Sequence, residues 1–189
     1  FVSGTTISSV TLHNQDKVNE KGVFVGATVA VRRAGDVIPE IASVIDKPAD
    51  GLFFTLPKTC PVCSSPVAKL PDRVEQYCTG GMVCAAQLIN SLVHFAKRDA
   101  MDIDGLGDTV AHQLVVEGLV KTPSDLYSLT VRDIMGLDGF AVKKADNLYT
   151  AIEKSKKIHL HRFIYALGIK CVGRRLSKRI ANCFGNIFN

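Results

Sequence analysis

Four of the six cysteines lie in one short segment and form two pairs. The first pair is Cys60-Pro61-Val62-Cys63; Cys78 follows after fourteen residues and Cys84 after five more. Two thiolates from one tight turn can chelate a tetrahedral ion, and Gly80-Gly81 gives the wider second pair the freedom to curl around it. Zinc prefers four soft sulfur ligands and imposes no redox chemistry. The spacing therefore predicts a structural Zn²⁺ site with no open position for water, and hence no catalytic role.

The remaining two cysteines stand apart from this cluster. Cys171 and Cys183 occur singly in helical, apolar surroundings, where a free thiol behaves as a small hydrophobe, so we predict buried positions for both. Three disulfides or a thioredoxin-like redox pair are the rival interpretations. The clustering argues against disulfides, and no strand and helix are predicted around the Cys-x-x-Cys pair. Because the cysteine set is complete, the five histidines are predicted to be surface or packing residues.

The composition is that of a folded protein rather than a disordered tail. Hydrophobic residues make up 47% of the 189 residues, enough for one large domain or two or three small ones. No segment approaches the roughly 20 apolar residues that cross a bilayer, and the first residues lack the features of a signal peptide. We therefore expect a cytoplasmic protein without a membrane partner. The chain starts without Met, and we interpret it as a fragment of a longer protein.

The net charge of +5 is unevenly distributed along the chain. Residues 141–181 contain eleven Lys or Arg and two acids, whereas residues 97–140 contain four and eight. A concentrated basic surface attracts a polyanion such as nucleic acid or an acidic membrane face, although a solvated helix surface has the same composition. Charge alone leaves these interpretations open.

The first zone of the chain, residues 1–57, is predicted to form β-structure. Residues 28–32 alternate valines with small or polar neighbours, and a turn follows at Ala34-Gly35-Asp36 before a second strand. Pro39 cannot donate to a ladder, so the second strand is expected at an edge or with a bulge there. A small, partly open β-barrel suits this zone because closure hides most strand edges. The second zone, residues 58–85, has too few apolar residues for its own core and needs the metal as a staple.

The third zone, residues 86–189, is predicted to be helical and to contain one unit three times. Leu88, Leu92 and Phe95 share a helix face. Three triplets then lie 34 and 32 residues apart, each with apolar residues four and two positions earlier, a small residue six positions later and an apolar residue nine positions later. The triplets are Gly105-Leu106-Gly107, Gly139-Phe140-Ala141 and Cys171-Val172-Gly173, and the small residues are Ala111, Ala145 and Ser177.

This repeated unit is typical of a helix-hairpin-helix. A hairpin with glycine lets the chain reverse tightly, and the small residue lets two helices cross closely. Amides at the N-terminus of the second helix then form an anion site suited to phosphate. One copy alone is equally typical of a helical turn with a glycine cap, but three copies in register indicate a repeat.

The three hairpins differ in charge and in glycine content. The first is flanked by Asp102, Asp104 and Asp108, which repel phosphate. The second has Ala141 for its last glycine and the third has Cys171 for its first, but both carry cations. We expect the later two to supply electrostatic attraction and the first to supply structure or a close backbone contact. The candidate nucleic-acid contacts of this zone are Gly105, Gly107, Gly139, Lys143, Lys144, Gly173, Arg174 and Arg175.

Several longer motifs accompany these features. They are Thr11-Leu12-His13-Asn14, Arg32-Arg33-Ala34-Gly35-Asp36-Val37-Ile38-Pro39, Cys78-Thr79-Gly80-Gly81, Met101-Asp102-Ile103-Asp104-Gly105-Leu106-Gly107 and Ala166-Leu167-Gly168-Ile169. Together they resemble the C-terminal half of bacterial NAD-dependent DNA ligases over essentially the whole chain. Helix-hairpin-helices occur in many repair proteins, so the specificity lies in the order of barrel, cysteine spacing and repeats.

The resemblance implies a multi-domain fold. Its parts are an oligonucleotide-binding (OB) barrel at 1–57, truncated at its N-terminus, a four-cysteine zinc finger at 58–85 and an all-α helix-hairpin-helix domain at 86–189, with a fourth repeat and a BRCT domain beyond Asn189. Arg32 and Arg33 are implied as contacts to the DNA backbone, unless one of them only caps the barrel. The implied partner is nicked double-stranded DNA, held by a monomer in the nucleoid, with the zinc finger fixing how barrel and helical domain meet.

The resemblance also implies which chemistry lies elsewhere. The family's adenylated lysine stands in a Lys-x-Asp-Gly motif, and Lys47-Pro48-Ala49-Asp50-Gly51 is one residue too long, so no catalytic residue is expected here. The intact enzyme would use NAD and Mg²⁺ through domains ahead of Phe1, pass AMP to the 5′-phosphate of a nick and seal it during replication and repair. A non-catalytic repair or recombination scaffold and, less strongly, a zinc-ribbon RNA-binding module remain alternatives.

Overall fold

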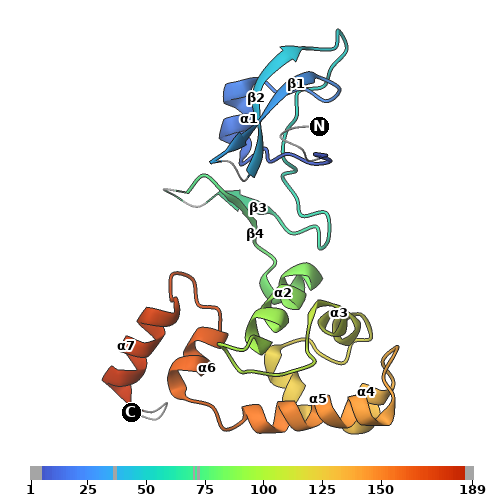
Figure 1. The fold of residues 1–189 in the computed structure, drawn as a ribbon, viewed down its shortest axis with the longest axis vertical. Coiled ribbons are helices and arrows are strands. Elements are labelled where there is room, and N and C mark those ends of the chain that lie inside the picture. The colour runs from blue at the N-terminus through green and yellow to red at the C-terminus, as the bar shows by residue number, and fades with distance from the viewer. Residues whose placement is uncertain (1–5, 36–37, 70, 72, 186–189) are drawn as a thin grey trace. The chain divides into compact units, whose positions relative to one another are not determined.

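The structure is a computed structural model that describes residues 6–35, 38–69, 71 and 73–185. The chain divides into two compact units, residues 1–79 and 80–189, and each is described by itself (Figure 1). No helix within the described ranges has both the length and the apolar character needed to cross a membrane.

The first unit is built on a two-stranded antiparallel ribbon. Strand β1 (Thr28–Ala34) pairs with β2 (Ile38–Asp46), and irregularities in the register occur between Thr28 and Val29 and between Ala30 and Val31. Pro39 lies one residue into β2, opposite Arg33, so the irregularity expected beside it lies further along the ribbon. Asp36 of the predicted turn and Val37, predicted to begin the second strand, lie outside the described residues.

A helix that the strand prediction missed precedes the ribbon. Helix α1 (Gln15–Lys21) begins at Asn14, whose side chain accepts a hydrogen bond from the Lys17 amide at 3.0 Å, and it ends at Gly22 with φ +61°. Asparagine before a helix and glycine after it are the ordinary start and stop signals. Val18 of this helix is buried with Val23 and Ile41, which form the small core of the unit.

The second unit is helical. Its elements are η1 (Gly81–Val83), α2 (Ala85–Ala96), α3 (Asp108–Val116), η2 (Pro123–Ser128), α4 (Val131–Met135), α5 (Val142–Ser155), α6 (Leu160–Ala166) and α7 (Arg174–Phe184). The three predicted triplets fall immediately before α3, α5 and α7. Helices α2 and α3, α4 and α5, and α6 and α7 pack in pairs, so each triplet connects two helices in contact.

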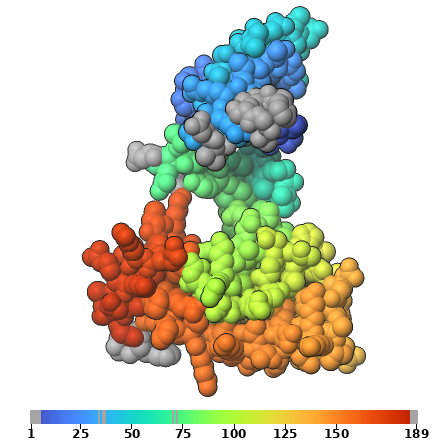
Figure 2. Space-filling view, in the orientation of Figure 1, coloured from blue at the N-terminus to red at the C-terminus, as the bar shows by residue number. Residues whose placement is uncertain are grey.

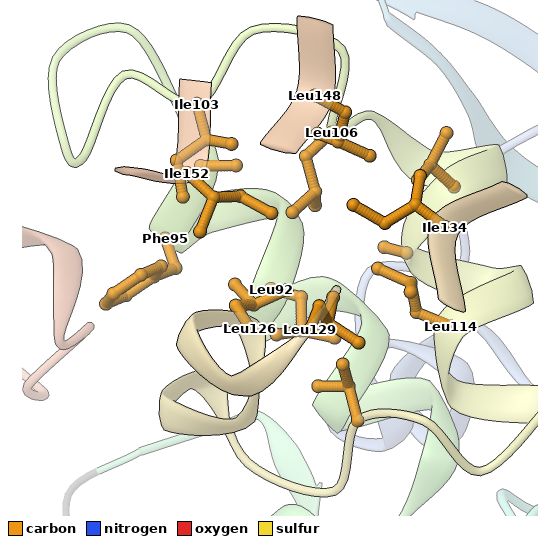
Figure 3. Packing of buried hydrophobic residues seen from close by; sticks show 14 of the residues in the cluster. Leu92, Phe95, Ile103, Leu106, Leu114, Leu126, Leu129, Ile134, Leu148 and Ile152 are labelled. Carbon is orange, nitrogen blue, oxygen red and sulfur yellow. The ribbon is translucent and has the colours of Figure 1, made fainter. Parts of the chain in front are cut away.

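One hydrophobic core joins the first two helix pairs. Leu92 of α2, Leu114 of α3 and Leu148 of α5 are almost completely buried and meet Leu126 and other residues from the intervening segments (Figure 3). The predicted apolar face of Leu88, Leu92 and Phe95 is confirmed, since all three are buried. Figure 2 shows the segments from α2 to α5, coloured green to orange, as one continuously packed body.

The third helix pair buries less of its apolar surface than the other two. Ile103 and Leu137, two positions before the first and second triplets, are 3% and 4% exposed, whereas the equivalent Ile169 is 49% exposed. Of the residues of α7, Ser177 is the one that is fully buried. The third copy therefore keeps the backbone of the repeat while its apolar positions lie largely open within the described part of the chain.

Candidate metal centre and nucleic-acid interface

The first two cysteines lie on a tight knuckle. The amide of Cys60 donates to the carbonyl of Ser65 at 2.8 Å, and the amide of Ser64 donates back to the carbonyl of Cys60 at 2.9 Å. Ser64 adopts φ +58°, which closes the turn after Cys63. This closure brings two thiols to the same side of one short loop, as the Cys-x-x-Cys spacing predicts.

A small hairpin and the start of a helix supply the other two cysteines. Strands β3 (Val67–Lys69) and β4 (Gln76–Cys78) are antiparallel, and Cys78 ends β4 opposite Val67. Gly81 then adopts φ +53°, the left-handed conformation that the chain needs to turn back. Cys84 is the residue before α2, and its carbonyl accepts the first helical hydrogen bond from Leu88 at 2.9 Å.

These local features bring four sulfurs together. The Sγ atoms of Cys60, Cys63, Cys78 and Cys84 all lie within 4.8 Å of one another, and those of Cys63 and Cys78 are 3.4 Å apart. Four sulfurs bound tetrahedrally at about 2.3 Å from zinc are separated by about 3.8 Å, so the cluster fits this ion. Hydrogen bonds from Ser65 lower the pKa of Cys63 to about 6, which favours the thiolate that a metal requires. The donor set supports Zn²⁺ as the resident ion.

The prediction for the two isolated cysteines is wrong. Cys171 and Cys183 form no disulfide within the described residues, and both are exposed rather than buried. Cys171 occupies the outward first position of the third hairpin, and Cys183 lies on the face of α7 that no described element covers. Ser177 is the one residue of α7 that is buried, so the apolar residues of this helix stay partly or fully exposed.

The three hairpins share one backbone conformation. The first residue of each triplet has positive φ: +86° at Gly105, +71° at Gly139 and +66° at Cys171. In each copy the amide of the second triplet residue donates to the carbonyl three residues earlier and so closes a turn. The N···O distances are 3.4 Å for Leu106, 3.2 Å for Phe140 and 2.9 Å for Val172. A glycine at this position satisfies the left-handed conformation without strain, and Cys171 adopts it with a side chain.

The three helices that follow also begin in the same way. Gly107, Ala141 and Gly173 precede α3, α5 and α7 with extended backbone and accept the first helical hydrogen bond at 2.9, 3.0 and 2.9 Å. The donors of these bonds are the predicted small residues Ala111, Ala145 and Ser177, and all three are fully buried. The amides of the first two residues of each helix precede these bonds, and they carry the positive end of the helix dipole.

The cations beside the second and third hairpins have different surroundings. Lys143 and Arg175 are both exposed and stand two positions after Ala141 and Gly173, so they are equivalent in the repeat. Lys144 folds back: its Nζ lies 4.0 Å from the Phe140 ring centroid and donates to the carbonyl of Gly139 at 3.2 Å. Arg174 lies 3.3 Å from the carboxylate of Asp99 and keeps 70% of its side chain exposed.

Acidic residues mark the first hairpin, as predicted from its sequence. Asp102, Asp104, Gly105 and Gly107 line an open cavity together with Arg98. The Asp102 carboxylate lies 3.5 Å from the guanidinium of Arg162, which partly offsets its charge. Thr109 stands where the other copies have Lys143 and Arg175. The first hairpin therefore has backbone amides that can donate to a phosphate but lacks the cations that flank the second and third hairpins.

Arg32 and Arg33 lie within β1, before the turn. Arg32 is opposite Glu40 in the ladder, and its Nε donates to the Glu40 carboxylate at 2.7 Å; Arg33 is opposite Pro39. Successive residues of a strand point to opposite faces, so the two guanidinium groups do not form one surface. Arg32 keeps 68% of its side chain exposed despite the ion pair and is the better placed of the two to meet a ligand.

Sequence reasoning missed the residue that holds Arg32. Glu40 is buried and also accepts a hydrogen bond from His13 Nε2 at 2.8 Å. These hydrogen bonds, with Arg32 contributing most, lower the pKa of the Glu40 carboxyl. The sequence did offer a signal for this ion pair, because Glu40 is an acid next to Pro39 in a strand that otherwise carries apolar residues at its buried positions.

A ribbon with a capped helix, a four-cysteine cluster suited to zinc and a helical repeat with basic hairpins are together typical of a nucleic-acid-binding protein. Comparison with known families makes this specific. Residues 1–51 match the NAD-dependent DNA ligase OB-fold domain, and residues 59–86 match the NAD-dependent DNA ligase C4 zinc finger domain. These domains are those of the C-terminal half of NAD-dependent DNA ligases, and the chain carries both in consecutive order.

Proposed function

We propose that the chain grips and positions nicked duplex DNA for an NAD-dependent DNA ligase that seals nicks during replication and repair. The observation that carries the proposal is the succession of two ligase-type domains and three hairpins with one backbone conformation. Positioning the 3′-hydroxyl in line with the 5′-phosphate accounts for a large share of catalysis in phosphoryl transfer. A module without its own nucleophile can therefore contribute strongly to the rate.

In this role the hairpins bind the DNA backbone. The free amides at the starts of α3, α5 and α7 donate to phosphate oxygens, and Gly105, Gly107, Gly139 and Gly173 let the backbone approach. Lys143 and Arg175 supply the strongest attraction because they are exposed and equivalent in the repeat. Lys144 and Arg174 must first leave the Phe140 ring and Asp99, so each contributes less. Arg32 adds a contact from the first unit.

The chain's own residues supply structure rather than bond-making groups. Cys60, Cys63, Cys78 and Cys84 hold Zn²⁺, which when bound cross-links the knuckle, β4 and the start of α2. The segment that resembles the adenylation motif, residues 47–51, forms a turn in which the Gly51 amide donates to the carbonyl of Pro48 at 3.0 Å. The Nζ atom of Lys47 lies 5.0 Å from the centroid of the Phe24 ring. NAD and Mg²⁺ would act through other domains of the enzyme, which we propose to be a cytoplasmic monomer.

One experiment tests DNA binding, and a second separates this function from a non-catalytic scaffold. The chain should bind a nicked duplex, and incubation with labelled NAD and Mg²⁺ should leave it without attached AMP. The gene region encoding the residues before Phe1 should carry Lys-x-Asp-Gly in a nucleotidyltransferase domain. Absence of that motif from the full-length protein would remove the ligase function and leave the scaffold. Failure of the chain to bind any duplex would contradict both.

A further inference from the structure

A second cationic feature of the helical unit lies between α6 and α7 and shares Arg174 with the third hairpin. Asp99, His161, Arg162, Tyr165, Arg174 and Lys178 line a cavity of about 250 Å³. Three lining residues come from α6, two from α7 and one from the turn after α2, so the cavity lies inside one unit. Its volume is many times the space that a single water needs, so a small polyatomic ligand has room there.

The charges around this cavity are poorly balanced. Arg162, Arg174 and Lys178 are cations, whereas Asp99 is the one carboxylate among the lining residues. Asp99 pairs with Arg174 at 3.3 Å and Asp102 lies 3.5 Å from Arg162, whereas no ion pair of Lys178 occurs within the described part of the chain. Like charges held together repel one another unless an anion lies between them. The arrangement therefore favours a bound anion.

The fold holds two of the lining side chains, Arg162 and Tyr165, in place. Arg162 donates from Nε to the carbonyl of Ala100 at 2.9 Å and also donates to the carbonyl of Arg98, so its guanidinium is held in place. Arg174 and Lys178 stand four residues apart and share a face of α7. The backbone carbonyl of Tyr165 accepts a hydrogen bond from His94 at 2.9 Å, and its ring packs edge-on against His94. Arg162 and Tyr165 are therefore held in place before any ligand arrives.

We propose that the cavity between α6 and α7 binds a phosphate group through Arg162, Arg174 and Lys178, with the Tyr165 hydroxyl as a neutral donor. Arginine and lysine donate charge-assisted hydrogen bonds to phosphate oxygens, and the cavity has room for one phosphate group. The group comes either from the DNA backbone or from a free phosphate compound. In the first case the inference rests on the proposed DNA-binding function; in the second it stands alone.

His161 makes the binding sensitive to pH. Burial, followed by the charges of Lys178, His159 and Arg162, lowers the pKa of His161, so the ring is mostly neutral at pH 7 in the free chain. Asp99, Arg174 and Tyr165 are the other titratable groups around the cavity. A bound phosphate stabilises the protonated ring, so binding takes up a proton and strengthens as the pH falls toward 6.

The test uses the zinc-loaded chain and inorganic phosphate at constant ionic strength. Histidine NMR, with His161→Gln to assign the signal, should show a higher pKa of His161 in phosphate than in chloride. Lys178→Gln should weaken phosphate binding about tenfold, and Lys154→Gln, an equal charge change on α5, should leave it unchanged. A His161 titration that is the same in phosphate and in chloride would overturn the proposal.

A competition experiment with duplex DNA identifies the source of the phosphate. If duplex DNA displaces inorganic phosphate and Lys178→Gln weakens both, the cavity takes a backbone phosphate. If phosphate binding persists in the DNA complex, the ligand is a free phosphate compound. A wild-type chain that binds phosphate but no duplex would contradict the proposed function and leave this inference standing. A chain that binds duplex but no phosphate would contradict this inference and leave the proposed function standing.

Discussion

Gly105 and Cys171 occupy the same backbone position in two hairpins, with φ +86° and +66°. Each is followed by an amide that closes the turn onto a carbonyl three residues earlier. The repeat thus imposes a left-handed conformation on its first triplet position whatever residue stands there. A side chain at such a position costs about 1–2 kcal/mol relative to glycine.

The first prediction concerns this strain. Cys171→Gly should raise the free energy of unfolding of the helical unit by about 1 kcal/mol, because glycine removes the conformational penalty and little burial is lost from an exposed thiol. Cys171→Ala keeps the Cβ atom and should show no such gain. Urea denaturation of the two variants and the wild type measures the difference. Equal gains for both would show that the thiol, and not the conformation, is responsible.

The second prediction separates folding from DNA contact within one hairpin. Gly105→Ala should destabilise the unit by about 1–2 kcal/mol because φ is +86°. Gly107→Ala should leave stability nearly unchanged, since Gly107 is extended, a Cβ there would meet nothing within 4 Å, and Ala141 occupies the same position in the second copy. If a DNA backbone approaches this hairpin closely, Gly107→Ala still weakens duplex binding. Unchanged affinity for duplex would remove the proposed close contact.

The third prediction concerns zinc. A strong chelator should unfold residues 59–86, because a segment with almost no core depends on its metal, while the core around Leu92 and Leu148 persists. Amide NMR signals of Ser64 and Thr79 report on the first effect, and methyl signals of the two leucines report on the second. We also expect duplex affinity to fall. Intact duplex binding after complete removal of zinc would contradict a role for the finger in DNA binding.

The fourth prediction concerns the pH dependence of the first unit. The hydrogen bonds from Arg32 and His13 lower the pKa of Glu40, so the folded state prefers the carboxylate. That preference stabilises the unit above the ordinary carboxyl pKa near 4.5 and is lost as the pH falls through the lower folded value. Glu40→Gln should therefore destabilise the unit at pH 7, with the difference shrinking below pH 4.5. A constant difference from about pH 7 to about pH 3 would exclude this linkage.

Features that depend on short stretches of sequence were predicted well. The cysteine spacing encodes the knuckle, and the glycines and small residues of the repeat encode turns and close helix contacts that need no knowledge of distant residues. Helix α1 was missed because the apolar pattern of the zone outweighed its two caps, Asn14 and Gly22.

Features that depend on tertiary contacts were not predictable. Glu40 meets His13 from 27 residues away, and the phosphate cavity collects side chains from three segments. The spacing of Arg174 and Lys178 was visible, but their neighbours on α6 were not. The exposure of Cys171 follows from the open third repeat, which its apolar sequence does not reveal.

The central claim is that equivalent cations in the second and third hairpins bind the DNA backbone. Fluorescence anisotropy of a labelled nicked duplex, recorded from about 50 to about 300 mM KCl, tests it most directly for the wild type and for Lys143→Ala combined with Arg175→Ala. The slope of log affinity against log salt should become shallower by about 1.8, as expected when two phosphate contacts are lost. Lys121→Ala combined with Lys154→Ala, an equal change in charge away from the hairpins, should keep the wild-type slope. A hairpin variant whose slope and affinity match this control would contradict the account.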